Sequence, residues 1–268
     1  MVNNICKNIQ HVRLYKPLVW NITNQVVMNN TANALLAIGA LPIMSHEKAE
    51  FEDLANIANV LVVNIGTMDD ALFESTKIAC SEISAIAKPW VLDPVGAGAS
   101  KFRTSKALDL LKMRPTVVRG NASEIMALAN AGISQSKGVD SYHHSSEALA
   151  SGKFLADKFQ TIVCISGAVD FIICGSEITS IKNGHQLMTQ VTGLGCTATA
   201  LIGAFVSVND HFYEAAVTAV ALLSVVGELA EKRASGPGTL QTNILDLLYS
   251  ITEKEFLTNL KKDSYESA

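Results

Sequence analysis

The sequence predicts a mainly parallel α/β sheet covered by helices on both faces. Short apolar runs alternate with helical patterns along most of the chain, which is typical of repeated βα units. The runs themselves are nearly continuous in apolar residues, as expected of strands buried on both faces. They are "PLVWN", "LPIMS", "VLVVNIG", "PWVLDP", "TVVRG" and "TIVCISG", which end at Asn21, Ser45, Gly66, Pro94, Gly120 and Gly167.

Helical patterns follow most of these strands, and the pattern changes after Gly167. The predicted helices cover about 24–38, 47–59, 68–87, 103–112, 121–131 and 145–158. The segment "FIICGSEITSIKNG" then predicts an antiparallel hairpin that turns at Gly175–Ser176. An apolar helix is expected near 211–233 and a C-terminal helix from about Leu240. Because no repeat or linker interrupts the chain, residues 1–268 are expected to form one domain.

Composition excludes several classes of protein. The chain is 49% hydrophobic and 17% charged, which favours a packed soluble protein. Its net charge of −4 is spread along the chain, so neither nucleic acid nor an anionic membrane is expected as a partner. The five cysteines form no CxxC pair and the first residues lack the apolar core of a signal peptide, so we expect a cytoplasmic protein. The apolar stretch "AAVTAVALLSVVGELAEKR" is interpreted as a buried helix.

Two long segments contain no Asp, Glu, Lys or Arg: Leu18–His46 and Asn183–Asn209. A solvated helix face normally has charges, whereas the helix predicted in the first segment has only amides. These amides are Asn24, Gln25, Asn29, Asn30 and Asn33. Two explanations remain, a face covered by a ligand or by another subunit and a surface that is merely polar. The absence of charge over both segments favours a covered, oligomeric site.

Polar residues gather where the predicted strands end, which is where open α/β sheets bind ligands. Asp93 either faces this edge as a carboxylate or caps a turn, and the glycines of "LDPVGAGAS" lack the third glycine of a dinucleotide motif. In "RGNASE", Arg119 is a phosphate-type donor, and Asn121 and Glu124 have the spacing of a helix capping box. The alternative for Glu124 is a hydrated Mg²⁺ shared with Asp93.

The stretch "TGLGCTATALIGAF" predicts an anion site at the start of a small-residue helix. Gly193 and Gly195 can adopt positive φ and allow a ligand close to the backbone. The free N–H groups of the helix N-terminus then face that ligand. Cys196, in the first turn, is expected to have a pKa lowered by the helix dipole. The competing interpretation is a buried, inert cysteine at a glycine-rich bend.

Several of these motifs together resemble those of the hydroxyethylthiazole kinase family. They are "PLVWNITNQVVMNNTANALLAIGALPIMS", "VLDPVGAGASKFR", "RGNASEIMALA", "KGVDS", "ISGAVD", "VTGLGC" and "GPGT", which extend from about residue 17 to about 240. The resemblance implies a ribokinase-like three-layer α/β/α sandwich and a homotrimer with active sites between subunits. It further implies ATP as co-substrate, Mg²⁺ as cofactor, and phosphorylation of 4-methyl-5-(2-hydroxyethyl)thiazole in thiamin biosynthesis or salvage.

The resemblance also implies roles on the substrate side. Met44 matches a thiazole-contacting methionine and Gly193 a substrate-contacting glycine, and we assign Asn24 to the same pocket. Cys196 stands where most ribokinase-like enzymes have an aspartate that faces the substrate hydroxyl, so Cys196, Gly193 and Gly195 are the predicted catalytic residues.

On the nucleotide side, Arg119 and Ser166 match ATP-binding positions, the latter more often threonine. Asn121 and Glu124 match an Asn-x-x-Glu motif associated with magnesium and phosphate. We therefore assign Asn121 to ATP, and Asp93 and Glu124 to the metal through water.

Three positions depart from the family pattern: Trp20, Ala168 and Leu194. They leave the fold unaffected but leave pocket shape and nucleotide contacts open. Two rival functions therefore remain. One is a related kinase that acts on the thiamin pyrimidine alcohol or another small alcohol. The other is a binding or regulatory protein that retains the pocket without turnover, which Cys196 and Ala168 would allow.

Overall fold

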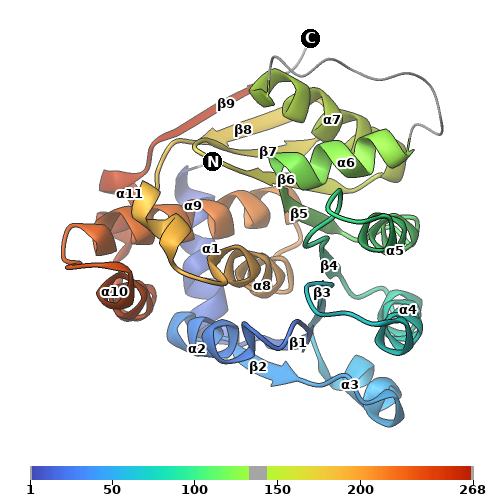
Figure 1. Ribbon diagram of the computed structural model, residues 1–268. Helices are drawn as coiled ribbons and strands as arrows, with labels where there is room; N and C mark the ends of the chain where they lie inside the picture. Colours follow the sequence, from blue (N-terminus) through green and yellow to red (C-terminus); the bar gives the residue numbers. More distant parts are fainter. Residues whose placement is uncertain (1, 133–143, 267–268) are drawn as a thin grey trace.

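The computed structural model describes residues 2–132 and 144–266, and a nine-stranded sheet runs through its centre (Figure 1). The strand order is β2-β1-β3-β4-β5-β6-β7-β8-β9. Strands β1 to β6 pair in parallel, whereas β7, β8 and β9 are antiparallel additions at one end. The bounds are β1 (Leu18–Ile22), β2 (Leu41–Met44), β3 (Val60–Asn64), β4 (Trp90–Asp93), β5 (Val117–Asn121), β6 (Ile162–Ser166), β7 (Asp170–Cys174), β8 (Glu177–Ile181) and β9 (Lys262–Glu266).

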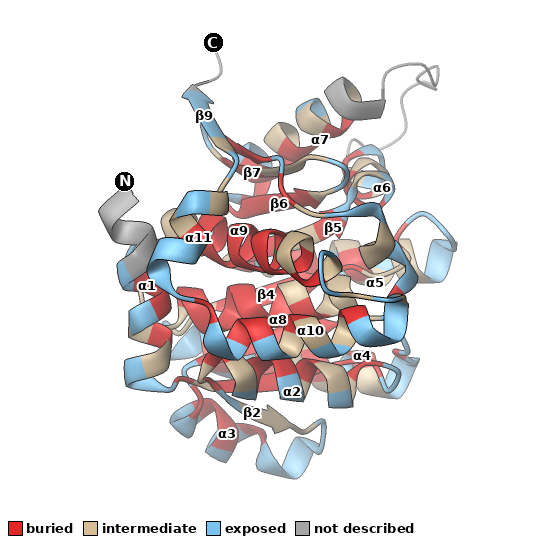
Figure 2. Cartoon of the chain, turned by 90° about the vertical axis from the view of Figure 1, so that its left-hand side faces the viewer, coloured by how far each residue is buried: buried red, intermediate tan, exposed pale blue. Residues whose placement is uncertain are grey.

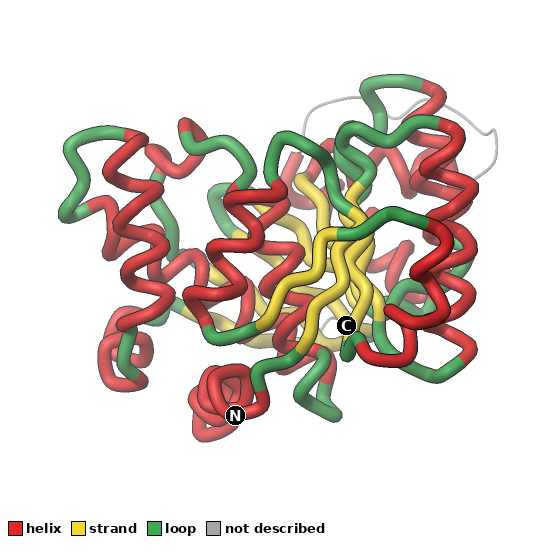
Figure 3. Tube along the Cα trace, turned by 90° about the horizontal axis from the view of Figure 1, so that it is seen from below, coloured by secondary structure: helices red, strands yellow, loops and turns green. Residues whose placement is uncertain are grey.

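Helices cover both faces of this sheet, so the described chain has three layers (Figure 3). One layer contains α1 (Val2–Tyr15), α2 (Met28–Ile38), α8 (Leu194–Val206), α9 (Phe212–Glu231), α10 (Pro237–Ser250) and α11 (Glu253–Asn259). The opposite layer contains α3 (Phe51–Ile57), α4 (Asp70–Ala85), α5 (Lys101–Leu111), α6 (Ala122–Gly132) and α7 (His144–Phe159). Two short 3-10 helices are η1 (Lys48–Glu50) and η2 (Gln186–Gln190).

Alternate residues of the parallel strands point into the two layers, as the period of a β-strand requires. Val19 and Val62 belong to the core beneath α8 and α9, whereas Trp20 and Leu61 belong to the core beneath α3 and α4. Both faces are therefore buried, and Figure 2 shows the same burial for α8 and α9. This explains why the strand sequences are continuously apolar rather than alternating, and it confirms the predicted three-layer class.

All six predicted parallel strands are present, and each ends within two residues of its predicted end. The predicted hairpin is confirmed as β7 and β8, with Gly175 at φ 55° in the turn. The motif "KGVDS" lies outside the described residues. The prediction of a single domain over the whole chain remains an expectation.

The first predicted helix begins later than expected, which moves Asn24 and Gln25 off it. Helix α2 begins at Met28. The amide of Asn24 accepts a hydrogen bond from the Val26 N–H at 3.1 Å and donates to Asn64 at 2.8 Å. These bonds hold the segment after β1 in a turn and tie it to β3, because an Asn side chain competes with the helix for backbone groups.

Sequence patterns also missed α1, α11 and β9, and they placed the start of α10 too late. Helix α10 begins at Pro237, after Gly236, rather than at about Leu240. Proline suits the first helical position because its missing N–H would have no partner there. The predicted apolar helix is confirmed as α9. Among the described residues, α9 alone is long and apolar enough to cross a membrane, but most of it is buried inside the fold, as in a core helix.

Helix α8 packs unusually closely on the sheet because Gly203 has no side chain. A Cβ at Gly203 would lie 2.6 Å from Cγ2 of Val62 on β3. Gly238, in contrast, has no atom within 4 Å of its hypothetical Cβ. This pair of helical glycines separates the effect of crowding from the effect of helix propensity.

We expect Gly203→Ala to lower the free energy of unfolding by about 1–3 kcal/mol, because an added methyl overpacks the contact between α8 and β3. Gly238→Ala should be neutral or slightly stabilising, since alanine favours the helix and meets no neighbour. Urea unfolding of both variants measures the difference. Equal stability of the two variants would show that α8 has room to move away from the sheet.

Candidate active site

The direction of strand addition reverses at β1, which creates a crevice at the carboxyl ends of β1 and β3. Helix α2 connects β1 to β2 on one face, whereas the later connections cover the opposite face. Ligands of open α/β sheets bind at such a switch point. Pairing between strands brings Asn64 level with Asp93, and Asn121 level with Ser166. The polar strand ends singled out from sequence therefore share one edge.

A chain of buried polar side chains crosses this edge from β4 to α8. Oδ2 of Asp93 accepts hydrogen bonds from Nδ2 of Asn64 and from Oγ1 of Thr199, both at 2.8 Å. Oδ1 of Asn64 in turn accepts from Nδ2 of Asn24 at 2.8 Å, and that nitrogen lies 3.5 Å from Sγ of Cys196. Sequence reasoning found Asp93, Asn24 and Cys196 but missed Asn64 and Thr199.

The carboxyl group of Asp93 is fully buried, with none of its surface exposed. Burial raises the pKa of Asp93 from an ordinary value of 3.8 to about 6, while the charge of Arg119 and the bonds from Thr199 and Asn64 act in the opposite direction. Oδ1 of Asp93 has no hydrogen-bond partner. An unpartnered oxygen on a buried carboxyl group is costly unless something positive approaches it.

The expected lowering of the pKa of Cys196 is wrong. Burial, followed by the charge of Asp93, raises the pKa of the Cys196 thiol to about 11, and the hydrogen bonds of Asn64 and Asn24 only partly offset this. The thiol is therefore protonated at neutral pH. Cys196 lies in the first turn of α8 as predicted, but the dipole of one helix does not outweigh burial of the thiol together with the charge of Asp93.

Gly193 and Gly195 serve two different purposes. Gly193 caps α8 with φ 84°, and a Cβ there would lie 2.6 Å from Cγ1 of Val27. Gly195 is within the helix without positive φ, contrary to the expectation for both glycines. A Cβ at Gly195 would lie 2.5 Å from Nη1 of Arg119, so this glycine makes room for the guanidinium. Arg119 also donates to Oγ of Ser166 at 2.7 Å.

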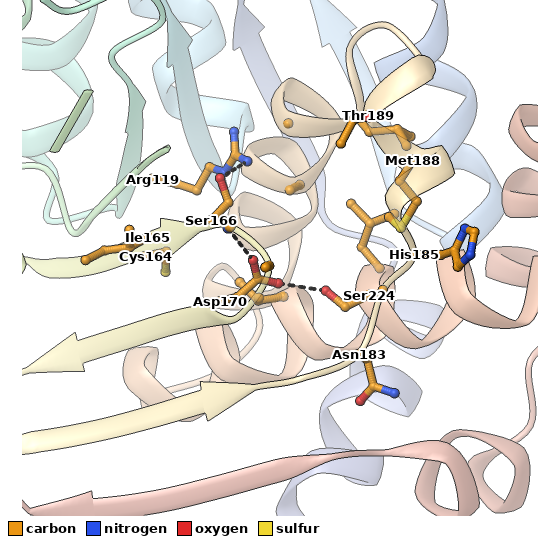
Figure 4. Close-up of a pocket in the computed structure, with 18 of the residues that line it drawn as sticks. Arg119, Cys164, Ile165, Ser166, Asp170, Asn183, His185, Met188, Thr189 and Ser224 are labelled. Atoms are coloured by element: carbon orange, nitrogen blue, oxygen red, sulfur yellow. Dashed lines mark hydrogen bonds between the residues drawn. The ribbon is translucent and has the colours of Figure 1, made fainter. Parts of the chain in front are cut away.

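Beside Arg119 lies a cavity of about 560 Å³ between β6, β7, α8, α9 and the segment that includes η2 (Figure 4). The predicted residues Arg119, Ser166 and Gly195 line it, as do the departures Ala168 and Leu194. Figure 4 shows Arg119 and Ser166 on one side of this cavity, with Met188 and His185 across from them.

Asp170 is a partly buried acid in this cavity that sequence reasoning missed. It accepts hydrogen bonds from the N–H of Gly167 at 3.0 Å and from Oγ of Ser224 at 2.9 Å. Burial raises the pKa of Asp170, and the charge of Arg119 partly opposes this. Its only sequence signal was its place at the end of "ISGAVD". The guanidinium of Arg119 thus influences two acids, the fully buried Asp93 and the partly buried Asp170.

The capping interpretation of "RGNASE" describes the geometry directly. Oδ1 of Asn121 accepts from the Glu124 N–H at 2.9 Å, and Oε2 of Glu124 accepts from the Asn121 N–H at 2.8 Å. Oε1 of Glu124 accepts from the Gly96 N–H at 2.8 Å, which ties the loop after β4 to α6. Each oxygen of Glu124 accepts one such bond, and a carboxylate oxygen has two lone pairs, so capacity for a metal-bound water remains.

Met44 and Asn24 do not line the 560 Å³ cavity. Met44 ends the edge strand β2 and is level with Asn21. Trp20 faces the core and does not line the 560 Å³ cavity. It is fully buried, its ring centroid lies 5.2 Å from that of Phe51, and its Nε1 donates to the Ser45 carbonyl at 2.9 Å. Of the predicted ATP-binding residues, Arg119 and Ser166 line this cavity and Asn121 does not, and the predicted substrate residues Met44, Asn24 and Gly193 also lie outside it.

This fold and this strand-edge site define a ribokinase-like α/β protein. The pyridoxal kinase of Staphylococcus aureus, solved with AMP-PCP and pyridoxal, is 17% identical with a TM-score of 0.66 and covers 94% of this chain and 99% of its own, a likeness of fold.

The family model of the hydroxyethylthiazole kinase family matches residues 9–254. "Hydroxyethylthiazole kinase" of Syntrophus aciditrophicus (strain SB) is 47% identical over 254 residues, 94% of each chain. The solved hydroxyethylthiazole kinase protein of Pyrococcus horikoshii OT3 is 39% identical, with a TM-score of 0.92 over 98% of this chain and 100% of its own. The chain belongs to the hydroxyethylthiazole kinase family.

We expect Asp93→Asn to raise stability at neutral pH. Because the raised pKa makes folded Asp93 bind its proton more tightly than the unfolded chain does, the stability of the wild type falls as pH rises from 3.8 towards about 6 and stays lower above that. At about 1.4 kcal/mol per pH unit, the penalty is about 3 kcal/mol at most.

Urea unfolding in EDTA between pH 4 and pH 7.5 measures this effect. The variant should be the more stable protein at pH 7.5, and the difference should close towards pH 4. Parallel pH curves for the two proteins would mean that Asp93 titrates normally in the folded state.

Proposed function

We propose that this chain transfers the γ-phosphoryl group of ATP to the hydroxyl of 4-methyl-5-(2-hydroxyethyl)thiazole. Membership of the family and the name of its 47% identical relative support this reaction. One observation within the structure supports it most: in the first turn of α8, Gly195 lies against the Arg119 guanidinium and lines the 560 Å³ cavity. Unpaired amides, a fixed cation and a cavity large enough for a nucleotide lie together there.

The first turn of α8 supplies backbone N–H groups that can stabilise the phosphoryl group during its transfer. Thr197 donates the first bond of the helix, to the Gly193 carbonyl at 2.8 Å. The N–H groups of Leu194, Gly195 and Cys196 precede that bond and have no acceptor within the helix. Phosphoryl transfer passes through a loose transition state whose negative charge lies on the phosphoryl oxygens, so positioned amides stabilise it.

Cys196 orients the substrate hydroxyl in this proposal. A loose transition state needs little base strength, so a thiol with a pKa of about 11 can stand where related enzymes have a carboxylate. Its Sγ lies beside Nδ2 of Asn24, which fixes the direction of the thiol. Because this thiol is protonated at neutral pH, it holds the hydroxyl by a hydrogen bond, and the hydroxyl proton leaves to solvent as the new bond to phosphorus forms.

The nucleotide occupies the 560 Å³ cavity in this proposal. Arg119 contacts the phosphates, and its bond to Ser166 fixes the guanidinium plane. Asn121, two residues beyond Arg119 at the end of the same strand β5, completes the phosphate side. The apolar side chains of Leu194 and Val220 and the methyl of Ala198 supply the surface for the base.

The residues at the strand ends fit a hydrated Mg²⁺. Among the described residues, no three His, Cys, Asp or Glu side chains form a metal-binding group, but Mg²⁺ needs only one or two carboxylates because it keeps several waters. Asp93, through its unpartnered Oδ1, and Glu124 would hold the ion through water. When bound, the ion neutralises charge on the transferred phosphoryl group.

The substrate side is proposed to lie between subunits of a homotrimer in the cytoplasm. Met44 is three strand spacings from Asp93 in the sheet order, or roughly 14 Å. Val26 in the turn before α2, Leu36 on α2 and Leu41 on the edge strand β2 are exposed, and all three lie within the segment that has no charged residue. Exposed apolar side chains without charges are typical of a face that another subunit covers.

We expect ATP consumption that depends on the thiazole alcohol, measured by release of ADP with and without it. The pyrimidine alcohol of the thiamin pathway should give little turnover.

Gly195→Val should abolish activity, because the valine side chain would displace Arg119. Arg119→Met removes the same guanidinium directly. The activity of the double variant should therefore be no lower than that of either single variant. Undiminished turnover in Gly195→Val would contradict the role of this helix start.

We expect self-association through the face of α2 and β2. Light scattering should give the mass of a trimer for the wild type and of a monomer for Leu36→Asp, because a charge there opposes burial of the face. Ile86→Asp is the control, since Ile86 is an exposed apolar residue outside that face. A monomeric wild type would remove the shared-site proposal, and it would leave the phosphotransfer proposal to the assay above.

A further inference from the structure

One arginine holds together the two loops that follow β3 and β4. Arg103, in the first turn of α5, donates from Nη1 to the carbonyls of Ile65 at 2.9 Å and Val95 at 3.2 Å. Its Nη2 donates to the carbonyl of Gly66 at 2.7 Å. These acceptors lie one or two residues beyond Asn64 and Asp93, where the two strands end.

These two loops bear on the groups that line the strand edge. The Gly66 N–H donates to Oδ1 of Asn64 at 3.0 Å, and a Cβ at Gly66 would lie 2.9 Å from Cβ of Asn24. In the other loop, the Gly96 N–H donates to Glu124. Movement of either loop would therefore displace the amide chain that leads to Cys196 or release the carboxylate of Glu124.

Gly96 shows that the approach of Arg103 is close. It has φ 78°, and a Cβ there would lie 2.8 Å from Cδ of Arg103. The left-handed backbone favours glycine, and the absence of a side chain lets the arginine stem pass beneath the loop. Three carbonyls in two chain segments suit the planar, forked guanidinium, whereas a lysine ammonium is a single point.

We propose that Arg103 is a positioning residue of the phosphotransfer site, which fixes Asn64, Asp93 and Glu124 relative to one another by clamping the two loops. The proposal rests on the function proposed above for its kinetic consequence, but the clamp itself concerns the free protein. Arg103 contacts neither the 560 Å³ cavity nor the start of α8 in the described chain. Its effect on turnover is therefore indirect.

The chain contains a matched control for this arginine–carbonyl interaction. Arg13 also donates to three main-chain carbonyls, those of Leu248, Tyr249 and Ile251, at 3.1–3.2 Å. Arg13 belongs to the last turn of α1, just before β1, and its guanidinium lies against the C-terminal end of α10, away from the carboxyl edge of the sheet. Arg13→Met and Arg103→Met thus remove the same kind of interaction at two places, one of which serves the proposed site.

Two measurements test the clamp. Amide hydrogen exchange of the substrate-free protein should accelerate by about tenfold or more in 64–68 and 94–99 for Arg103→Met, and not for Arg13→Met. Steady-state kinetics should show kcat lowered about tenfold or more with the KM for ATP within about twofold of the wild type, because the cavity is untouched. Arg13→Met should keep the kcat of the wild type.

Unchanged exchange in these segments, a uniform increase over the whole chain, or a normal kcat despite local acceleration would each overturn the proposal. If Arg103→Met does not fold, Arg103→Lys is measured in the same way. Intermediate exchange and kcat then support the clamp, and wild-type behaviour overturns it. Because exchange is measured without substrate, a failure of the thiazole assay in the wild type would be a separate result that leaves the exchange test valid.

Discussion

The buried carboxyl group of Asp93 is the constraint on which the carboxyl edge of the sheet depends. A charge removed from water costs several kcal/mol unless neighbours compensate. The compensation comes from separate elements: Asn64 from β3, Thr199 from α8 and the charge of Arg119 from β5. Each partner must reach a fixed point, so the strand ends and the start of α8 acquire fixed relative positions before any ligand arrives.

Glycines allow α8 to meet that constraint. Gly203 brings the helix against Val62, Gly195 leaves space for Arg119, and Gly193 turns the chain sharply into the first turn. One helix therefore delivers the thiol of Cys196, the hydroxyl of Thr199 and a set of unpaired amides to the same edge. The run of small residues in this stretch reflects close approach on several sides rather than flexibility.

The sequence was sufficient for the parallel strands because burial on both faces leaves continuous apolar runs, and for the motif residues because they follow those runs. It was insufficient for β9, whose "KDSYE" is polar and whose place is set by pairing with β8. The prediction of a lowered pKa for Cys196 was also wrong. A helix dipole contributes about 0.3–1 kcal/mol, whereas a rise from 9.0 to about 11 corresponds to about 3 kcal/mol. Asn64 and Thr199 were missed because only tertiary contact reveals that a buried acid needs them.

The charge balance of the site gives a physical reason for the divalent cation we propose. The charge of Arg119 acts on two acids, the fully buried Asp93 and the partly buried Asp170, and it partly offsets the rise in pKa that burial causes at each. A single guanidinium whose charge also offsets two acids can neutralise only part of the charge of a triphosphate. Amides of the α8 N-terminus supply partial charges, but these are too small to neutralise a polyanion alone. A cation that also meets the unpartnered Oδ1 of Asp93 would satisfy the buried carboxyl group and the incoming phosphates together.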